Sequence, residues 1–132
     1  MIIKSFEINK IKLNSYKFYL FYGDNEGLKE ETIKNLFEKN YSDKINRYEE
    51  KEILDNINDF FNGIFTKSFF DNEKLIIINR ATDKIREIIE ELIKKNPKDI
   101  QIILNSKNLE KKSNLRKIFE KDKSIICVPF YE

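Results

Sequence analysis

The chain has 132 residues, of which 40% are hydrophobic and 36% are charged, and its formal net charge is +2. This composition is too apolar for a disordered protein, and the length suits one domain with a core of its own. The absence of histidine and the single cysteine, Cys127, exclude a disulfide framework, zinc sites and Ser/His or Cys/His nucleophile systems.

No apolar run approaches the roughly 20 residues that cross a bilayer. The first residues, MIIKSFEINK, also lack the long apolar core of a secretory signal. We therefore expect a cytoplasmic protein without a membrane contact. Cys127 lies in the apolar run SIICV, which predicts a buried and unreactive thiol.

The first half of the chain alternates between strand and helix patterns. The run KFYLFYG at 17–23 predicts a strand that ends in a turn at Gly23. Apolar residues recur at helical spacing from Leu28 to Phe37, and a weaker strand pattern follows at 45–50. The clearest helix is predicted from Lys51 to Thr66, where a two-column apolar stripe contains Ile53, Leu54, Ile57, Phe60, Phe61, Ile64 and Phe65.

The second half continues the alternation. The continuously apolar run at 74–79 predicts a strand buried on both faces, and further strands are predicted at 99–106 and 124–131. Between them we predict a helix capped by Thr82 or Asp83, and a basic helix over 109–123. Five strands alternating with four helices predict an α/β fold of three αβα layers, with a mainly parallel five-stranded sheet.

The turn after the first strand, YGDNEGLKEET, lies where a phosphate-binding loop would be expected. A working loop needs the spacing G-x-x-x-x-G-K-[ST]. Here Gly23 and Gly27 are separated by three residues, and Lys29 is followed by two glutamates. The strand at 74–79 ends in Asn79, where a nucleotide hydrolase usually has a magnesium-binding aspartate. We therefore predict no catalytic, cofactor or metal site, and a degenerate nucleotide-binding domain stays only as an alternative.

Two adjacent aromatic residues, Phe69 and Phe70, follow the helix predicted to end at Thr66. Phe69 falls near the edge of the apolar stripe and Phe70 well outside it. The pattern alone permits two interpretations, in which the rings pack under the next strand or in which they anchor a partner.

The order of the motifs resembles the N-terminal domain of the delta subunit of the bacterial DNA polymerase III clamp loader. The similar pieces are YLFYGDNEGLKEE, SFFDNEKLIIINRA, ILNSKNLEKKSNLRKIFEK and VPFYE, which cover nearly the whole chain. The resemblance implies a RecA/AAA+-like domain, residues 1–132, that has lost its nucleotide site. In this family lid and collar domains follow, so we expect an isolated N-terminal domain.

The resemblance also implies a function without catalysis, which is binding of the sliding clamp (the beta subunit) and promotion of its opening. It places the hydrophobic anchor at Phe69 and Phe70, flanked by Thr66, Lys67 and Ser68. The pair is Phe-Phe where Leu-Phe is common, and Phe65 or Thr66 replaces the upstream glutamine of clamp-binding peptides. Further expected partners, in the full-length protein, are the other clamp-loader subunits.

An alternative function is a nucleic-acid contact through the segment 107–123. This segment has seven basic and three acidic residues, a net charge of +4, so the rest of the chain has a net charge of −2. The basic side chains proposed to contact DNA phosphates or a neighbouring subunit are Lys111, Lys112, Arg116 and Lys117. The segment has no interleaved aromatic residues for base stacking, which favours a solvated or subunit-facing surface and at most a weak DNA contact.

Overall fold

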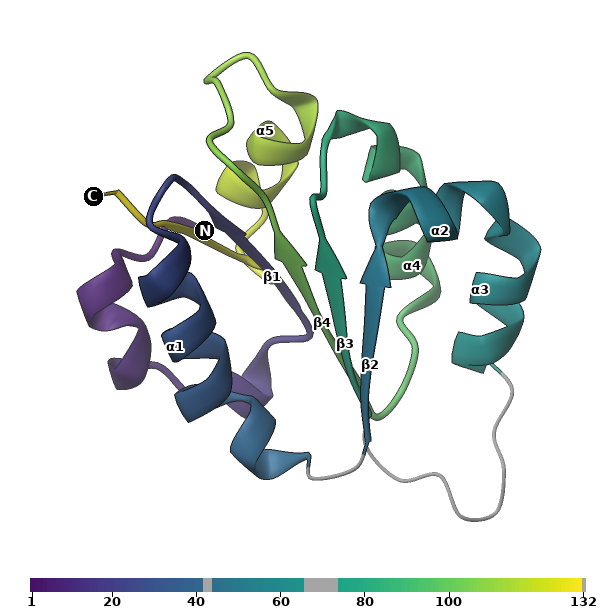
Figure 1. Cartoon of the computed structure of the whole chain (residues 1–132), viewed down its shortest axis with the longest axis horizontal. Coiled ribbons are helices and arrows are strands. Elements are labelled where there is room, and N and C mark those ends of the chain that lie inside the picture. The colour runs from purple at the N-terminus through teal and green to yellow at the C-terminus, as the bar shows by residue number, and fades with distance from the viewer. Residues whose placement is uncertain (42–43, 66–73, 132) are drawn as a thin grey trace.

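The computed structural model describes residues 1–41, 44–65 and 74–131. A five-stranded sheet lies at the centre, with helices on both faces (Figure 1). Its strands lie in the order β2-β3-β4-β1-β5 and all four pairings are parallel. The strands are β1 (Phe18–Tyr22), β2 (Ile45–Glu49), β3 (Lys74–Asn79), β4 (Ile100–Asn105) and β5 (Ile126–Pro129). The predicted α/β fold of three layers is thereby confirmed.

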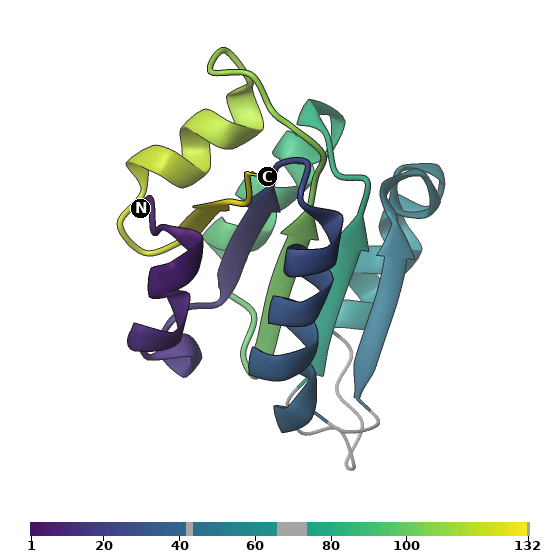
Figure 2. The ribbon, with the colours of Figure 1, turned by 60° about the vertical axis from the view of Figure 1, so that its left-hand side comes forward.

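One face of the sheet is covered by α1 (Glu26–Leu36) and by the 3-10 helices η1 (Ser5–Lys10) and η2 (Leu13–Ser15) near the N-terminus, and η3 (Glu38–Asn40) continues beyond α1 (Figure 2). The other face packs against α2 (Glu50–Asp55), α3 (Ile57–Phe65), η4 (Asp83–Ile85), α4 (Arg86–Lys95) and α5 (Asn114–Lys121). The sequence patterns did not predict the 3-10 helices.

The strands are continuously apolar because both faces of the sheet are covered. In β1, Phe18, Leu20 and Tyr22 enter the core beneath α3, α4 and α5. Tyr19 and Phe21 enter the second core beneath α1. Every residue of β1 is therefore buried, as the run FYLFY predicted.

The order of the strands creates a topological switch point between β1 and β4. From β1 the chain crosses to β2 at the far edge of the sheet, and from β4 it crosses back to β5 on the other side of β1. In open α/β sheets, ligands bind in the crevice outside the carboxyl ends of the strands at such a point. This crevice is where the sequence predicted a degenerate phosphate loop.

The helix predicted over Lys51–Thr66 is two helices, α2 and α3, in the described residues. The backbone leaves the helical region at Asn56, with φ −143° and ψ 60°. The break resets the direction of the apolar stripe, so Phe60 and Ile64 are buried while Ile57 is 40% exposed.

The basic helix predicted over 109–123 is also shorter, because α5 begins at Asn114. The Ser113 side chain accepts a hydrogen bond from the amide of Arg116 and caps the helix there. Lys111 and Lys112 lie in the turn before the helix rather than on it.

The first residues lie beside the last strand. The amino group of Met1 donates hydrogen bonds to the carbonyl oxygens of Phe119 (2.5 Å), Asp122 (2.8 Å) and Ile125 (2.8 Å). Cys127 is fully buried, and burial raises the pKa of its thiol to about 12, as expected for an unreactive cysteine. Among the described residues, no helix is both long and apolar enough to cross a lipid bilayer.

Candidate functional site

The turn after β1 is fixed by Gly23, whose φ is +122°. A Cβ atom at this position would lie 2.1 Å from the backbone oxygen of Phe130, so only glycine fits. Two residues later, the Asn25 side chain accepts a hydrogen bond of 3.2 Å from the amide of Leu28 and caps α1. Gly23 therefore allows the turn after β1 to pass close to the backbone of Phe130, and Asn25 caps the N-terminus of α1.

Lys29 lies inside the switch-point crevice and is fully buried. Its Nζ donates to Glu26 Oε1 at 2.9 Å and to the backbone oxygen of Ser106, just after β4, at 2.7 Å. The lysine therefore joins the first turn of α1 to the end of β4. In a working phosphate loop the lysine is directed toward the phosphates, whereas here its ammonium group is bound within the protein.

The carboxyl ends of β3 and β4 present amides. Asn105 Nδ2 donates to Asn79 Oδ1 at 3.1 Å across the two strands. Ser106 follows, and its Oγ is buried without a hydrogen-bond partner in the described residues. Within the ranges 1–41, 44–65 and 74–131, no three acidic or cysteine side chains come together as metal ligands. The ends of β3 and β4 therefore present amide and hydroxyl groups.

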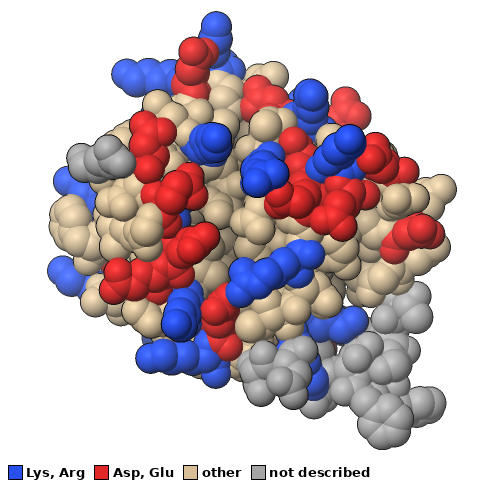
Figure 3. Space-filling view, viewed as in Figure 1, with Lys and Arg blue, Asp and Glu red and all other residues tan. Residues whose placement is uncertain are grey.

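A surface hollow opens between α1 and the carboxyl ends of β2, β3 and β4. It consists of two adjoining cavities of about 600 and 340 Å³ that share Glu30, Asn79 and Asn105. Figure 3 views the molecule from this side and shows acidic and basic side chains intermingled over it. We refer to this feature as the α1 hollow.

The acidic side chains around the α1 hollow differ in whether they have partners. Glu26 pairs with Lys29 and Glu49 pairs with Arg80, each at 2.9 Å. Glu38 pairs with Arg47. Glu30 and Glu31, on α1, have no ion pair with any residue that the structure describes. Sequence reasoning identified these two glutamates as unfavourable for phosphate, but it did not find the buried role of Lys29.

The predicted clamp-binding residues, Thr66, Lys67, Ser68, Phe69 and Phe70, lie outside the described residues. The element before them is α3, which ends at Phe65, and the element after them begins at Lys74. Phe65 is 40% exposed and stacks on Phe61, with ring centroids 6.2 Å apart. The ammonium group of Lys95 lies 5.5 Å from the centroid of each ring. Phe61 and Phe65 therefore form a partly exposed aromatic surface at the end of α3.

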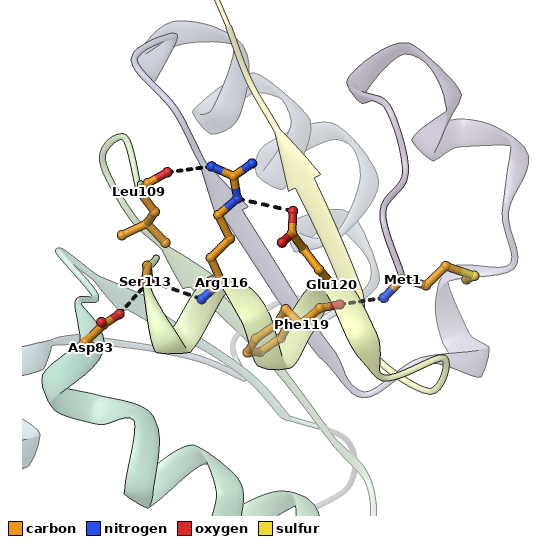
Figure 4. Close-up of polar contacts among 7 residues, drawn as sticks. All are labelled: Met1, Asp83, Leu109, Ser113, Arg116, Phe119 and Glu120. Carbon is orange, nitrogen blue, oxygen red and sulfur yellow. Dashed lines mark hydrogen bonds and ion pairs between the residues drawn. The ribbon is translucent and has the colours of Figure 1, made fainter. Parts of the chain in front are cut away.

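The four basic residues proposed to contact DNA or a subunit have different environments. Lys111, Lys112 and Lys117 are exposed. The side chain of Arg116 is only 13% exposed. It donates to Glu120 Oε2 at 3.2 Å and to the carbonyl oxygen of Leu109 at 2.7 Å (Figure 4). The structure thus separates Arg116, which is bound within the protein, from the three lysines.

The guanidinium of Arg116 also lies 4.9 Å from the ring centroid of Tyr22, at the end of β1. This distance is within the range of a cation–π contact. Arg116 therefore connects α5 with the turn before it and with the central sheet, which is a structural role.

Asp83 is a second polar residue whose role the sequence did not predict. It was considered as a cap for the helix that follows it, but its carboxylate accepts hydrogen bonds at the start of α5 (Figure 4). The donors are Ser113 Oγ at 2.5 Å, the Asn114 amide at 3.0 Å and the Leu115 amide at 3.2 Å. Partial burial acts to raise the pKa of Asp83, but these hydrogen bonds outweigh it, so the pKa lies below its usual value.

Thr82, the residue before Asp83, accepts a hydrogen bond from the Lys84 amide and caps η4.

The Asp83 carboxylate occupies the position at the N-terminus of α5 where an anion would bind. A phosphate would therefore have to displace this carboxylate.

Comparison with known proteins supports the resemblance found in the sequence. The chain is similar in structure to the Bacillus subtilis DNA clamp loader delta protein (YqeN), with a TM-score of 0.70 and 17% sequence identity. The similarity covers 97% of this chain and 42% of that one, so this chain spans less than half the length of that relative. None of the curated proteins matches the chain. The family model for the DNA polymerase III delta subunit matches residues 19–128. The chain therefore belongs to the DNA polymerase III delta subunit family.

Proposed function

We propose that the chain is a non-catalytic module that binds a sliding clamp and takes part in loading it during DNA replication. The observation that carries this proposal is the match of the family model to residues 19–128. The similar Bacillus subtilis structure, described as a clamp loader delta protein, supports it at the level of the fold. The family further implies assembly with other clamp-loader subunits.

The residues proposed to bind the clamp are Phe69 and Phe70, with Thr66, Lys67 and Ser68 beside them. This assignment comes from the resemblance of the segment to the family. In the chain, the residues follow α3, which ends at Phe65, and precede β3, which begins at Lys74. Two phenyl rings buried in a pocket of the clamp would contribute roughly 3 to 6 kcal/mol before the cost of ordering is subtracted. Neighbouring charges would act mainly on the rate of association.

A module that only binds the sliding clamp can promote its opening only if it binds the open form more tightly than the closed form. A ligand shifts the clamp toward an open form by the difference between its affinities for the open and the closed form. The chain needs no nucleotide of its own for this step. The internal hydrogen bonds of Lys29 support that view, since they engage the cation that would otherwise meet a phosphate.

The proposal is tested by titrating a purified bacterial sliding clamp, the beta subunit, with the parent chain and with a Phe69→Ala, Phe70→Ala double variant. We expect the double variant to bind at least about 100-fold more weakly, the equivalent of roughly 3 kcal/mol. A Phe6→Ala variant is the matched control, because Phe6 is 70% exposed in η1 and lies outside the proposed site. Equal affinity of the parent chain and the double variant for the clamp would show that the assignment is wrong.

A further inference from the structure

We propose that Asn62 and Gly63, on α3, form a site of spontaneous deamidation, where Asn62 loses ammonia and becomes isoaspartate, and that isoaspartate breaks this helix. The inference does not depend on clamp binding. It rests on the sequence of the two residues, on their exposure and on the short length of α3.

Asn62 and Gly63 are the only Asn-Gly pair in the chain. In deamidation the backbone nitrogen of the next residue attacks the asparagine side chain, so a side chain on that next residue hinders the reaction. Glycine has no side chain, and its backbone is free to adopt the conformation that the attack requires. Every other asparagine in the sequence is followed by a residue that has a side chain.

The packing of α3 does not require glycine at position 63. Its backbone is helical, and an added Cβ would lie more than 4 Å from any described atom other than the adjacent residues and the backbone of the helix itself. Glycine lowers the equilibrium constant of helix formation by about two- to five-fold relative to alanine. The residue therefore weakens α3 without a gain in packing.

Both residues of the pair are open to solvent. Helix α3 lies at the outer side of the molecule (Figure 1). Asn62 and Gly63 are exposed, whereas Phe60 and Ile64 are the buried residues of the helix. Solvent can therefore supply the base and the water that the reaction consumes.

The reaction consumes one water molecule and releases one molecule of ammonia. A base from solvent removes the amide proton of Gly63, and the nitrogen attacks Cγ of Asn62. As this N–Cγ bond closes a five-membered imide, the side-chain nitrogen takes up a proton and leaves as ammonia. Water then opens the imide. Cleavage of the N–Cγ bond gives aspartate, and cleavage of the bond from the nitrogen to the Asn62 backbone carbonyl carbon gives isoaspartate.

The imide can form only when α3 opens around Gly63. In a closed helix a carbonyl one turn earlier holds the Gly63 amide, and ψ of Asn62 has its helical value. Helix α3 has only nine residues, and the break at Asn56 separates it from α2. A helix of this length is marginal by itself. We therefore expect α3 to open locally, without unfolding of the whole domain.

Isoaspartate would interrupt α3 because the chain would then run through the former side chain and gain one backbone carbon. The residues after position 62 would lose their helical relation to those before it. The stack of Phe61 on Phe65, with centroids 6.2 Å apart, spans this position and would be lost. The altered helix is also the one that precedes the proposed clamp-binding residues.

The site is tested by keeping the purified chain at mildly alkaline pH and digesting it with trypsin. The peptide between Lys51 and Lys67 contains Asn56, Asn58 and Asn62, so two asparagines serve as internal controls. Electron-transfer fragmentation locates the conversion and separates isoaspartate from aspartate. A sample digested without incubation gives the background. We expect conversion at Asn62 to be at least about ten-fold faster than at the other two, which precede residues with side chains.

The same measurement in concentrated urea gives the rate for the unfolded chain. The folded chain should react more slowly than the unfolded one, but by less than about 1,000-fold, because global unfolding alone would lower the rate further. A larger difference would overturn the proposal, since α3 would then open only with the whole domain. Equal conversion at Asn58 and Asn62 would also overturn it.

Two variants separate the roles of the glycine and of the extra backbone carbon. Gly63→Ala keeps Asn62 and should slow conversion in the folded chain by at least about two-fold. An unchanged rate would contradict the role of Gly63. Asn62→Asp has the charge of the product without the extra carbon. After chromatographic separation, the isoaspartate form should exchange the amide hydrogens of α3 at least about ten-fold faster than Asn62→Asp.

Equal hydrogen exchange in the isoaspartate form and in Asn62→Asp would show that the helix tolerates isoaspartate, and would overturn that part of the proposal. Because no clamp is present in these experiments, none of their results bears on Phe69 and Phe70.

Discussion

The ammonium group of Lys29 donates a hydrogen bond of 2.7 Å to the backbone oxygen of Ser106, 77 residues later in the chain. The buried Lys29 side chain thus lies at the switch point between β1 and β4, and its hydrogen bond links α1 to the end of β4. The lysine of the degenerate phosphate loop therefore stabilises the contact between α1 and the residue that follows β4.

Replacing Lys29 by methionine keeps most of the apolar bulk of the side chain and removes the charge. The Ser106 carbonyl would lose this donor, and we expect a loss of about 1 to 3 kcal/mol in the free energy of unfolding. Glu26 should contribute little to this loss, because its side chain is 54% exposed and remains hydrated.

The free energy of unfolding is measured by urea denaturation, with Lys34→Met, an exposed lysine on the same helix, as the control. The control should change stability by no more than about 0.5 kcal/mol. Unchanged stability of Lys29→Met would mean that the desolvation of the ammonium cancels its hydrogen bonds.

Arg116 should behave as a structural residue rather than as a contact for DNA. Lysine keeps the charge but cannot reproduce the planar fork that reaches both Glu120 and the Leu109 carbonyl. We therefore expect Arg116→Lys to lower the free energy of unfolding by about 1 to 2 kcal/mol. A Lys117→Ala control, at an exposed position of the same helix, should be neutral in thermal or urea denaturation.

Gel retardation of duplex DNA separates this role from the nucleic-acid alternative. Any binding at low salt should come from Lys111, Lys112 and Lys117, and should disappear when all three are replaced by alanine. Binding that survives the triple variant but is lost in Arg116→Lys would contradict the structural role of Arg116.

These residues illustrate what the sequence could and could not predict. The strands were predictable because an uninterrupted apolar run in a short segment requires cover on both faces, as in β1 and β3. The break at Asn56 was not predicted, because the apolar stripe continues past it. The local signal was the run DNIND at 55–59, since Asp and Asn favour helix N-termini over helix interiors.

The roles of Lys29, Arg116 and Asp83 depend on partners that are distant in the sequence or on other elements. The sequence analysis assigned Arg116 to a basic surface from its charge alone. Residue type could not show that its side chain lies over the ring of Tyr22. The clamp-binding residues came from the resemblance to the family and remain a prediction, since they lie outside the described residues.

Asp83 should make the stability of the domain depend on pH in the acidic range. Its pKa is lowered in the folded state, so its contribution is fully present above the pKa of an unfolded aspartate, about 3.9. That contribution is lost as the pH falls through the lower folded value, because protonation removes the charge that accepts three hydrogen bonds.

An Asp83→Asn variant should therefore be less stable than the parent by about 1 kcal/mol at neutral pH, as for the loss of a helix cap. The difference should shrink as the pH falls below about 4, where the parent also loses its charge. The difference in the free energy of unfolding is measured by urea denaturation at several pH values. The control is Asp24→Asn, at an exposed position in the turn after β1. A difference that stays constant across this range would contradict the capping role of the charged carboxylate.

Two glycines in the degenerate phosphate loop should respond in opposite directions to the same substitution. At Gly23 the backbone φ is +122° and an added Cβ would lie 2.1 Å from the Phe130 backbone oxygen. That oxygen cannot easily move, since the Phe130 amide donates to the Tyr22 oxygen at 2.7 Å. We expect Gly23→Ala to cost about 3 kcal/mol or more.

At Gly27, in the first turn of α1, the backbone is helical. Apart from the adjacent residues and the backbone of α1 itself, no atom of the described residues lies within 4 Å of the added Cβ. Alanine there should stabilise the chain by about 0.5 to 1 kcal/mol, because glycine loses more conformational entropy in a helix. The midpoint of urea denaturation should therefore be lower than that of the parent in Gly23→Ala and higher in Gly27→Ala. Destabilisation by Gly27→Ala would contradict the unhindered helical environment of this position.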